Sequence, residues 1–208
     1  MKSPRIGGGL TIIGAVLFAI ATLFHPPLTN PWDVSYAYKE MSTHEHWVLD
    51  HWVFLLGVTL WLIGLTHLSL IQSGIQPIYR LSAYLIMVAL TLWVIILAGE
   101  IAVLPFLMKQ ITVYGQKAYL PAWNAFFIWG LFSGYLAMLF IYIALLFLSA
   151  GQRRWMKGFG LLSSGLSIIG NLLSLLFPEA ALPLIVLNLL PFAWSLIFGW
   201  FQLRGKSL

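Results

Sequence analysis

The chain has 208 residues, of which 61% are hydrophobic and only 8% are charged, and its formal net charge is +5. Soluble domains carry about 25% charged residues, so this chain lacks the polar side chains needed to cover a water-exposed surface. The composition therefore excludes an ordinary soluble protein and indicates an integral membrane protein. The sequence has no cysteine, which also excludes disulfides, thiolate ligands and thiol nucleophiles.

Six long apolar runs predict an all-α, polytopic bundle of six transmembrane helices in a single domain covering residues 1–208. A span needs about 20 residues, because the hydrocarbon is about 30 Å thick and a helix rises about 1.5 Å per residue. The first run is longer than the usual ~7–15-residue core of a signal peptide and no cleavage site follows it, so we interpret it as a span. The runs lie at roughly 6–24, 47–71, 81–108, 123–149, 159–177 and 182–203.

A short additional helix is predicted between the first two runs, in the segment NPWDVSYAYKEM. Asn30 is placed as an N-cap, Pro31 at the first helical position and Asp33 in the first turn, which is typical of a helix start. Trp32 and Tyr36 are four residues apart and share one face of such a helix. We expect this helix to lie in the membrane interface, and a lid over a binding site is the alternative.

The second run begins with a polar segment, STHEHWVLDHW. Ser42 and Glu45 match the capping-box pattern S-x-x-E, which would make His44 and His46 solvated residues of the first turn. The alternative is a functional site. His46 and Asp50 are four residues apart, and a carboxylate beside an imidazole strengthens it as a metal ligand.

Further ionisable residues are expected at the same depth in the membrane. Glu100 lies in the third run, and a carboxylate inside an apolar run is a functional-site hypothesis by default. Residues His25, Asp50, His51 and Glu100 come from three helices and are expected to converge, as in helix bundles that build cofactor sites. The candidate haem ligands are His25 and His51. The candidate ligands for zinc, copper or iron are His44, His46, Asp50, His51 and Glu100.

The basic residues predict the topology. If both termini are cytoplasmic, eight basic residues lie on that side and three on the other, in accord with the positive-inside rule. The polar cluster then faces outward from the cell membrane. Basic residues confined to short loops also argue against nucleic acid as a partner. The eight are Lys2, Arg5, Arg80, Arg153, Arg154, Lys157, Arg204 and Lys206, and the three are Lys39, Lys109 and Lys117.

Three classes of function remain open from the sequence. The first is a metal-binding or haem-binding membrane protein, the second a small-solute binding or transport subunit, and the third a structural or assembly subunit with no ligand. The second and third imply partner membrane subunits. No phosphate loop or nucleophile elbow is present, so nothing in the sequence argues directly for catalysis.

The GxL-rich first span that ends in "HPP" resembles that of small uncharacterised bacterial six-span families. That resemblance implies the fold but no particular chemistry. The chain length, six spans and inward termini are also similar to those of the substrate-binding subunits of energy-coupling vitamin transporters. No diagnostic motif of that family is present, so no residue roles are transferred from it.

Overall fold

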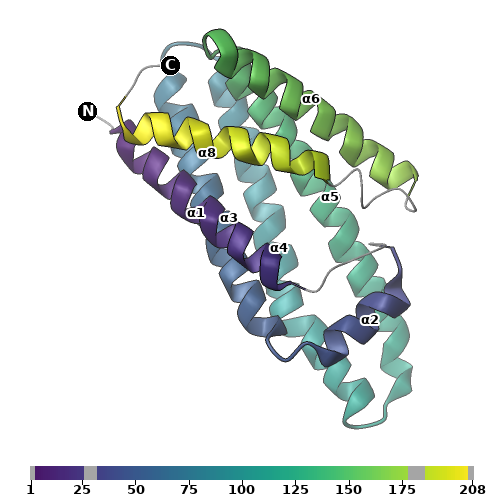
Figure 1. The fold of residues 1–208 in the computed structure, drawn as a ribbon. Helices are drawn as coiled ribbons and strands as arrows, with labels where there is room; N and C mark the ends of the chain where they lie inside the picture. The colour runs from purple at the N-terminus through teal and green to yellow at the C-terminus, as the bar shows by residue number, and fades with distance from the viewer. Residues whose placement is uncertain (1–2, 26–31, 178–185, 206–208) are drawn as a thin grey trace.

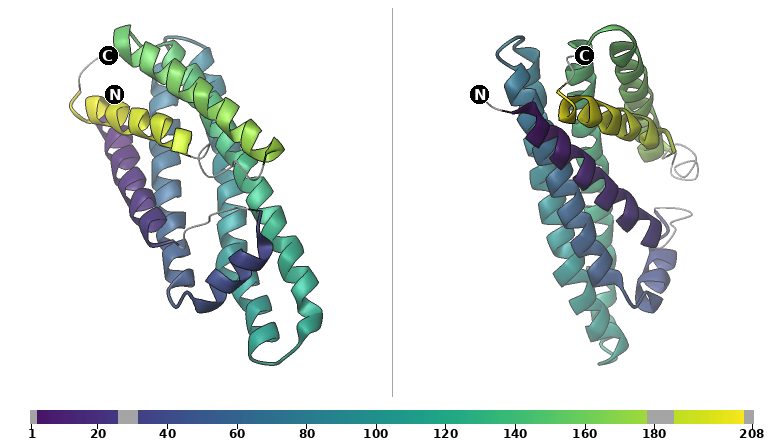
Figure 2. Two further views of the ribbon diagram at one scale, coloured as in Figure 1. Left: turned by 45° about the vertical axis from the view of Figure 1, so that its right-hand side comes forward. Right: turned by 60° about the vertical axis from the view of Figure 1, so that its left-hand side comes forward.

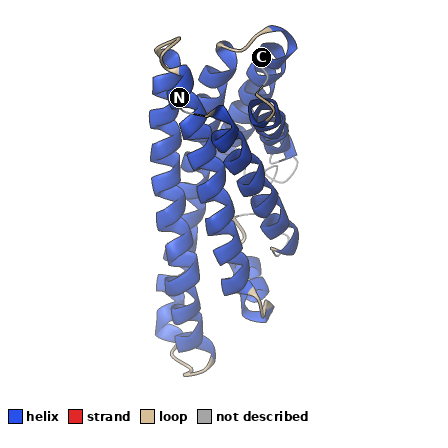
Figure 3. Cartoon of the chain, turned by 90° about the vertical axis from the view of Figure 1, so that its left-hand side faces the viewer, coloured by secondary structure: helices blue, strands red, loops and turns tan. Residues whose placement is uncertain are grey.

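The computed structural model describes residues 3–25, 32–177 and 186–205, which form helices and connecting loops with no strand among them (Figure 3). Six of the helices are long and apolar enough to cross a membrane, as the sequence predicted. The helices are α1 Pro4–Phe24, α2 Val34–Thr43, α3 Trp47–Gln72, α4 Ile78–Thr112, α5 Leu120–Ala150, α6 Arg154–Leu176 and α8 Leu189–Leu203, with short 3-10 turns at Lys117–Tyr119 and Val186–Asn188.

The third span differs most from its predicted bounds of 81–108. Helix α4 has 35 residues and continues past Pro105 to Thr112. A proline in a helix removes one backbone donor, but the helix resumes where the surrounding packing holds it. The predicted start of the last span, at residue 182, lies outside the described residues, and α8 itself begins at Leu189.

The six long helices form a closed ring in the order α1, α3, α4, α5, α6 and α8, with α8 packed against α1 (Figures 1 and 2). Large side chains from several helices fill its interior, including Trp61 from α3, Tyr142 from α5 and Trp194 from α8. The indole N–H of Trp61 donates to the Ser195 hydroxyl, and that of Trp194 donates to the Met156 carbonyl. These bonds satisfy polar atoms that would otherwise be buried without partners.

The closest helix crossing is between α1 and α3. A Cβ atom placed on Gly14 of α1 would lie 2.1 Å from the backbone nitrogen of Trp61. One on Gly57 or Gly64 of α3 would lie 2.6 Å from Phe18 N or 2.5 Å from Thr11 N, respectively. Glycine at these positions therefore lets the two backbones touch, which is how helices associate closely in lipid.

The start of α1 and the end of α8 lie at one end of the bundle, which we call the terminal end (Figure 1). The turns after α3 and after α5 meet at this end, where the Gln152 amide donates to the Gln72 side-chain oxygen at 3.0 Å. The described basic residues that were predicted to be cytoplasmic are at this end. Its assignment to the cytoplasm stays a prediction.

The opposite end, which we call the distal end, is formed by α2, the start of α3 and the α4–α5 hairpin. Helix α4 is about 52 Å long at 1.5 Å per residue, so it exceeds a bilayer core of about 30 Å. Helix α2 packs against the hairpin and the start of α3 through a second hydrophobic cluster, which includes Ala37, Met41, Trp47, Leu104 and Trp123. This end carries the candidate site.

Candidate functional site

Three predicted site residues come together at the distal end. His25 caps the end of α1, His51 lies in the second turn of α3, and Glu100 lies in the distal part of α4. The His51 Nε2 and Glu100 Oε2 atoms are 3.3 Å apart. The His25 and His51 ring centroids are 5.3 Å apart. The predicted convergence is confirmed for these three residues.

Both ring nitrogens of His51 have partners. Nδ1 lies 2.7 Å from the Trp47 carbonyl oxygen, which can only accept, so Nδ1 carries the hydrogen and donates it. Nε2 faces the Glu100 carboxyl group, and that contact is favourable only with a hydrogen between the two atoms. The pair is therefore an imidazolium beside a carboxylate or an imidazole beside a carboxylic acid. Either arrangement satisfies an ionisable group in an apolar helix.

Trp47 supports this pair from two directions. Its ring stacks on His51 with centroids 4.1 Å apart and planes inclined by 26°. Its indole N–H donates to the Glu100 carbonyl oxygen at 2.9 Å, which ties the start of α3 to α4. The position of the His51 imidazole is thus set by the same tryptophan that holds the two helices together.

His25 adds a third ring system to the same group. Its imidazole centroid lies 5.5 Å from the Trp47 ring and 5.6 Å from the Phe54 ring. Because His25 belongs to α1, these contacts join the end of α1 to the site. His25 therefore packs beside His51, and it is His51 that contacts the Glu100 carboxyl group.

His44 and Asp50 form a separate pair. The His44 Nε2 and Asp50 Oδ2 atoms are 2.5 Å apart, and the two side chains are 23% and 12% exposed. The predicted pairing of Asp50 with His46 is wrong, because His46 occupies the N-cap position of α3 with an exposed side chain. The carboxyl group of Asp50 is therefore paired with His44, and the predicted convergence of Asp50 with His51 and Glu100 stays a prediction.

The predicted capping box is wrong as well. Ser42 lies in the last turn of α2, where its hydroxyl donates to the Lys39 carbonyl at 2.7 Å. Helix α3 begins only at Trp47 and has no side-chain cap bond, and Glu45 is exposed in the turn between the helices. The reason is that α2 continues to Thr43, so Ser42 is already part of the preceding helix.

The predicted short helix is present as α2, with a later start than expected. Asp33 is its N-cap and accepts a hydrogen bond from the Tyr36 amide at 3.0 Å. The predicted cap and first helical residue, Asn30 and Pro31, lie outside the described residues. An aspartate at the cap satisfies one of the free amides of the first turn, as expected of this residue type.

Trp32 lies just before α2 and stacks on the Tyr135 ring of α5, with centroids 5.8 Å apart and planes inclined by 13°. Trp32 therefore packs against α5, and the expected placement of α2 in the membrane interface stays a prediction. Tyr135 lines a cavity, so Trp32 packs against a residue of the cavity wall.

No group of three or more histidine, aspartate or glutamate side chains in the described parts of the chain is placed to hold a metal ion. The haem interpretation requires a free imidazole nitrogen on both His25 and His51, and the two nitrogens of His51 are engaged. Metal or haem binding therefore has no support from the described residues and stays a prediction.

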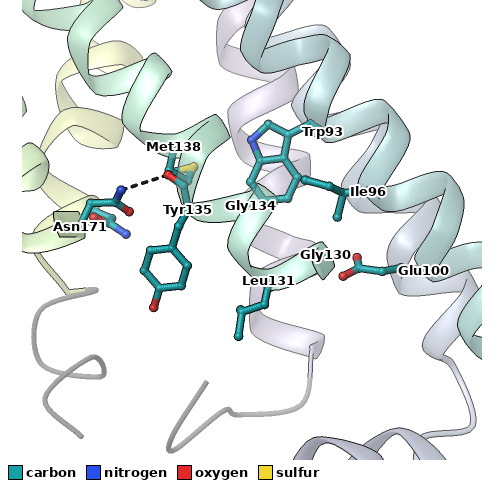
Figure 4. Close-up of a pocket in the computed structure, with 10 residues that line it drawn as sticks. Trp93, Ile96, Glu100, Gly130, Leu131, Gly134, Tyr135, Met138 and Asn171 are labelled. Carbon is teal, nitrogen blue, oxygen red and sulfur yellow. Dashed lines mark hydrogen bonds between the residues drawn. The ribbon is translucent and has the colours of Figure 1, made fainter. Parts of the chain in front are cut away.

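Two cavities adjoin Glu100. The larger has a volume of about 220 Å³ and lies between α4, α5, α6 and the turn before α8 (Figure 4). Its walls are mainly apolar and aromatic, and it is partly open. The smaller, of about 60 Å³, includes His25, Glu40 and Trp47 in its lining. The larger is lined by Trp93, Ile96, Glu100, Gly130, Leu131, Gly134, Tyr135, Met138, Asn171 and Asn188.

Sequence reasoning missed this larger cavity. An asparagine inside an apolar run, such as Asn171 or Asn188, predicts only an interhelical hydrogen bond, and the Asn171 amide does donate to the Tyr135 carbonyl at 3.0 Å. The available signal was Gly130 and Gly134, four residues apart and hence on one face of α5. Nothing lies within 4 Å of a Cβ placed on Gly134. Glycine there leaves space, unlike the glycines of the α1–α3 crossing.

Comparison of the chain with protein-family models, curated proteins and solved structures finds no match.

Proposed function

We propose that this protein binds a small solute in the larger cavity, as a binding or transport subunit of the cell membrane, alone or with partner membrane subunits. With both termini in the cytoplasm, the cavity is reached from the outer side. The observation that carries the proposal is the Glu100 carboxyl group, which borders both cavities while one of its oxygens contacts His51.

The lining of the larger cavity suits an amphipathic solute. Apolar and aromatic walls with a few polar atoms are typical of small-molecule sites. Among the described residues, the Trp93 indole nitrogen and the Asn188 side-chain oxygen are buried without a hydrogen-bond partner. Such atoms are costly to leave unpaired in a protein interior, and a bound solute would satisfy them.

The volume limits the size of the solute. A water molecule takes about 30 Å³ of the liquid, so about 220 Å³ holds roughly seven waters or an organic molecule of about ten non-hydrogen atoms. This cavity is smaller than the pockets that bind drug-sized ligands, which span about 300–1,000 Å³.

Glycine substitution tests the proposal. Gly134→Leu would fill the cavity without a backbone clash, whereas Gly165→Leu places the same side chain on α6 at a position with equally open space that does not line the cavity. Thermal unfolding is measured against a panel of small amines, alcohols, amides and carboxylates. We expect a panel member to stabilise the wild type and Gly165→Leu but not Gly134→Leu. Equal stabilisation of all three proteins would contradict the proposal.

Access to the cavity is tested with a thiol, since the chain has no cysteine of its own. Gly134→Cys should react with a small neutral methanethiosulfonate in water, and a bound solute should slow that reaction. Ser42→Cys, at an exposed position of α2, is the control whose labelling should not respond to the solute. An unreactive thiol at position 134, with a reactive one at position 42, would overturn the proposal.

A further inference from the structure

We propose that the solute in the larger cavity is a small organic cation, with its ammonium group held by Glu100 and its apolar body against the aromatic wall. This inference rests on the proposed function and adds the chemical class of the ligand.

The charged groups around the two cavities are acidic. Glu100 lines both cavities and Glu40 lines the smaller one. Among the described residues, no lysine or arginine lines either cavity, and His25 is the one histidine in their linings. An anion entering the larger cavity would meet the Glu100 carboxylate, whereas the His51 imidazole that balances its charge lies behind it and lines neither cavity. The cavity therefore favours cations.

The orientation of Glu100 separates its two oxygens. Oε2 faces the His51 imidazole at 3.3 Å. Oε1 lies on the side of Gly130, where a Cβ atom would be 3.9 Å from it, and Figure 4 shows the carboxyl group directed toward that part of α5. Among the described residues Oε1 has no hydrogen-bond partner. His51 itself lines neither cavity, so it positions the carboxyl group from behind and leaves one oxygen to the solute.

The aromatic lining completes a cation site. Trp93 and Tyr135 both border the larger cavity. Aromatic faces attract ammonium groups within about 6 Å of the ring centre, and tryptophan does so most strongly. The Tyr135 ring is held by its stack with Trp32. A carboxylate with aromatic walls therefore recognises an organic ammonium compound better than an inorganic cation, because the described residues offer no group of three side-chain ligands for a metal ion.

Charged thiol reagents test directly whether the electrostatic potential in the cavity is negative. Gly134→Cys is treated with trimethylammonioethyl methanethiosulfonate and with its sulfonatoethyl counterpart, and the ratio of the two rates is divided by the same ratio for Ser42→Cys. A single carboxylate a few ångströms away speeds one reagent and slows the other several-fold each, so we expect a normalised preference for the cation of about tenfold. Glu100→Gln in the Gly134→Cys chain should remove the preference. Glu45→Gln, which removes the same charge from an exposed position at the distal end, should leave it unchanged.

Protection from labelling tests the ligand class. Benzyltrimethylammonium should slow the reaction of Gly134→Cys with a neutral methanethiosulfonate at least tenfold more effectively than 4-phenylbutan-2-ol or 3-phenylpropanoate, which are similar in size. Equal rates for the two charged reagents, together with equal protection by the alcohol, would overturn the cation proposal and leave the small-solute function standing. A thiol at position 134 that reacts with no reagent would overturn both.

The source of the ammonium group is distinguished with vesicles of defined composition. Phosphatidylglycerol vesicles contain no ammonium headgroup, so labelling of Gly134→Cys there reports the empty cavity. Slower labelling after phosphatidylethanolamine is added would assign the cation to a lipid headgroup. If this lipid leaves the labelling rate unchanged but benzyltrimethylammonium slows it, the cation that occupies the cavity is a dissolved solute.

Discussion

The contact between His51 and Glu100 is expected to stabilise the folded protein, and a double-mutant cycle measures by how much. At 3.3 Å and an effective dielectric constant of about 20, two unit charges attract by about 5 kcal/mol. Desolvation of both groups opposes this attraction, and the Glu100 side chain is 22% exposed, so water screens part of it. We expect a net coupling energy of about 1–3 kcal/mol, the usual range for residues in direct contact.

The cycle compares His51→Ala, Glu100→Gln and the double variant by reversible unfolding in mixed detergent micelles. His51→Ala alone should cost more than the coupling energy, because it also removes the ring that packs against Trp47 and Phe54. That packing loss is common to the single and double variants and cancels in the cycle. The destabilisation by the double variant should therefore be smaller than the sum of the two single values by about 1–3 kcal/mol.

A second cycle with His44→Ala and Glu100→Gln is the control, because His44 pairs with Asp50 instead. The destabilisations caused by these two single substitutions should add up to that of the double variant within about 0.5 kcal/mol, as for residues that share no partner. Additivity in the His51 cycle as well would refute the reasoning, because the two side chains would then be neighbours without an energetic contact. Coupling of equal size in both cycles would refute it too, since the effect would not be specific to the pair.

Other predictions concern the topology, the α1–α3 crossing, the outer tryptophan and the metal hypothesis. Reporter fusions after Lys39 and after Arg154 should report opposite sides of the membrane, and the same side for both would end the proposed orientation. Gly14→Ala should destabilise the protein by about 2 kcal/mol or more, because a Cβ atom would lie 2.1 Å from Trp61 N. Gly165→Ala, where nothing lies within 4 Å, should change stability by less than about 1 kcal/mol, and equal values would contradict the close crossing. With Trp32 as the sole tryptophan, its fluorescence should resist quenching by acrylamide, and full access would contradict its stack on Tyr135. If the histidines bind haem or a transition metal, the purified protein should show visible absorbance or a stoichiometric metal content that His51→Ala removes, and the absence of both signals would end that hypothesis.

Hydropathy alone predicted the six spans, because the hydrocarbon imposes a minimum length on any apolar helix that crosses it. Turn chemistry was sufficient to predict the existence of α2, though its cap is Asp33. Depth along each helix also predicted that His25, His51 and Glu100 would approach one another. Axial position follows from counting residues, since each adds about 1.5 Å.

Only the tertiary structure decided which imidazole contacts which carboxyl group. Asp50 pairs with His44 rather than His46 because the chain turns between α2 and α3, and the capping-box pattern at Ser42 placed the start of α3 four residues before its observed N-cap, His46. The spacing of four residues between His46 and Asp50 would have mattered only if both lay within one helix.

The cavity likewise depended on the tertiary structure. In a soluble helix the apolar stripe identifies the buried face, but these helices are apolar all round because lipid replaces water. The sequence therefore determined how deep Glu100 lies but left its direction around the axis of α4 undetermined. Packing against α3 and α5 set that direction, turning one oxygen toward His51 and the other toward the space beside Gly130 and Gly134.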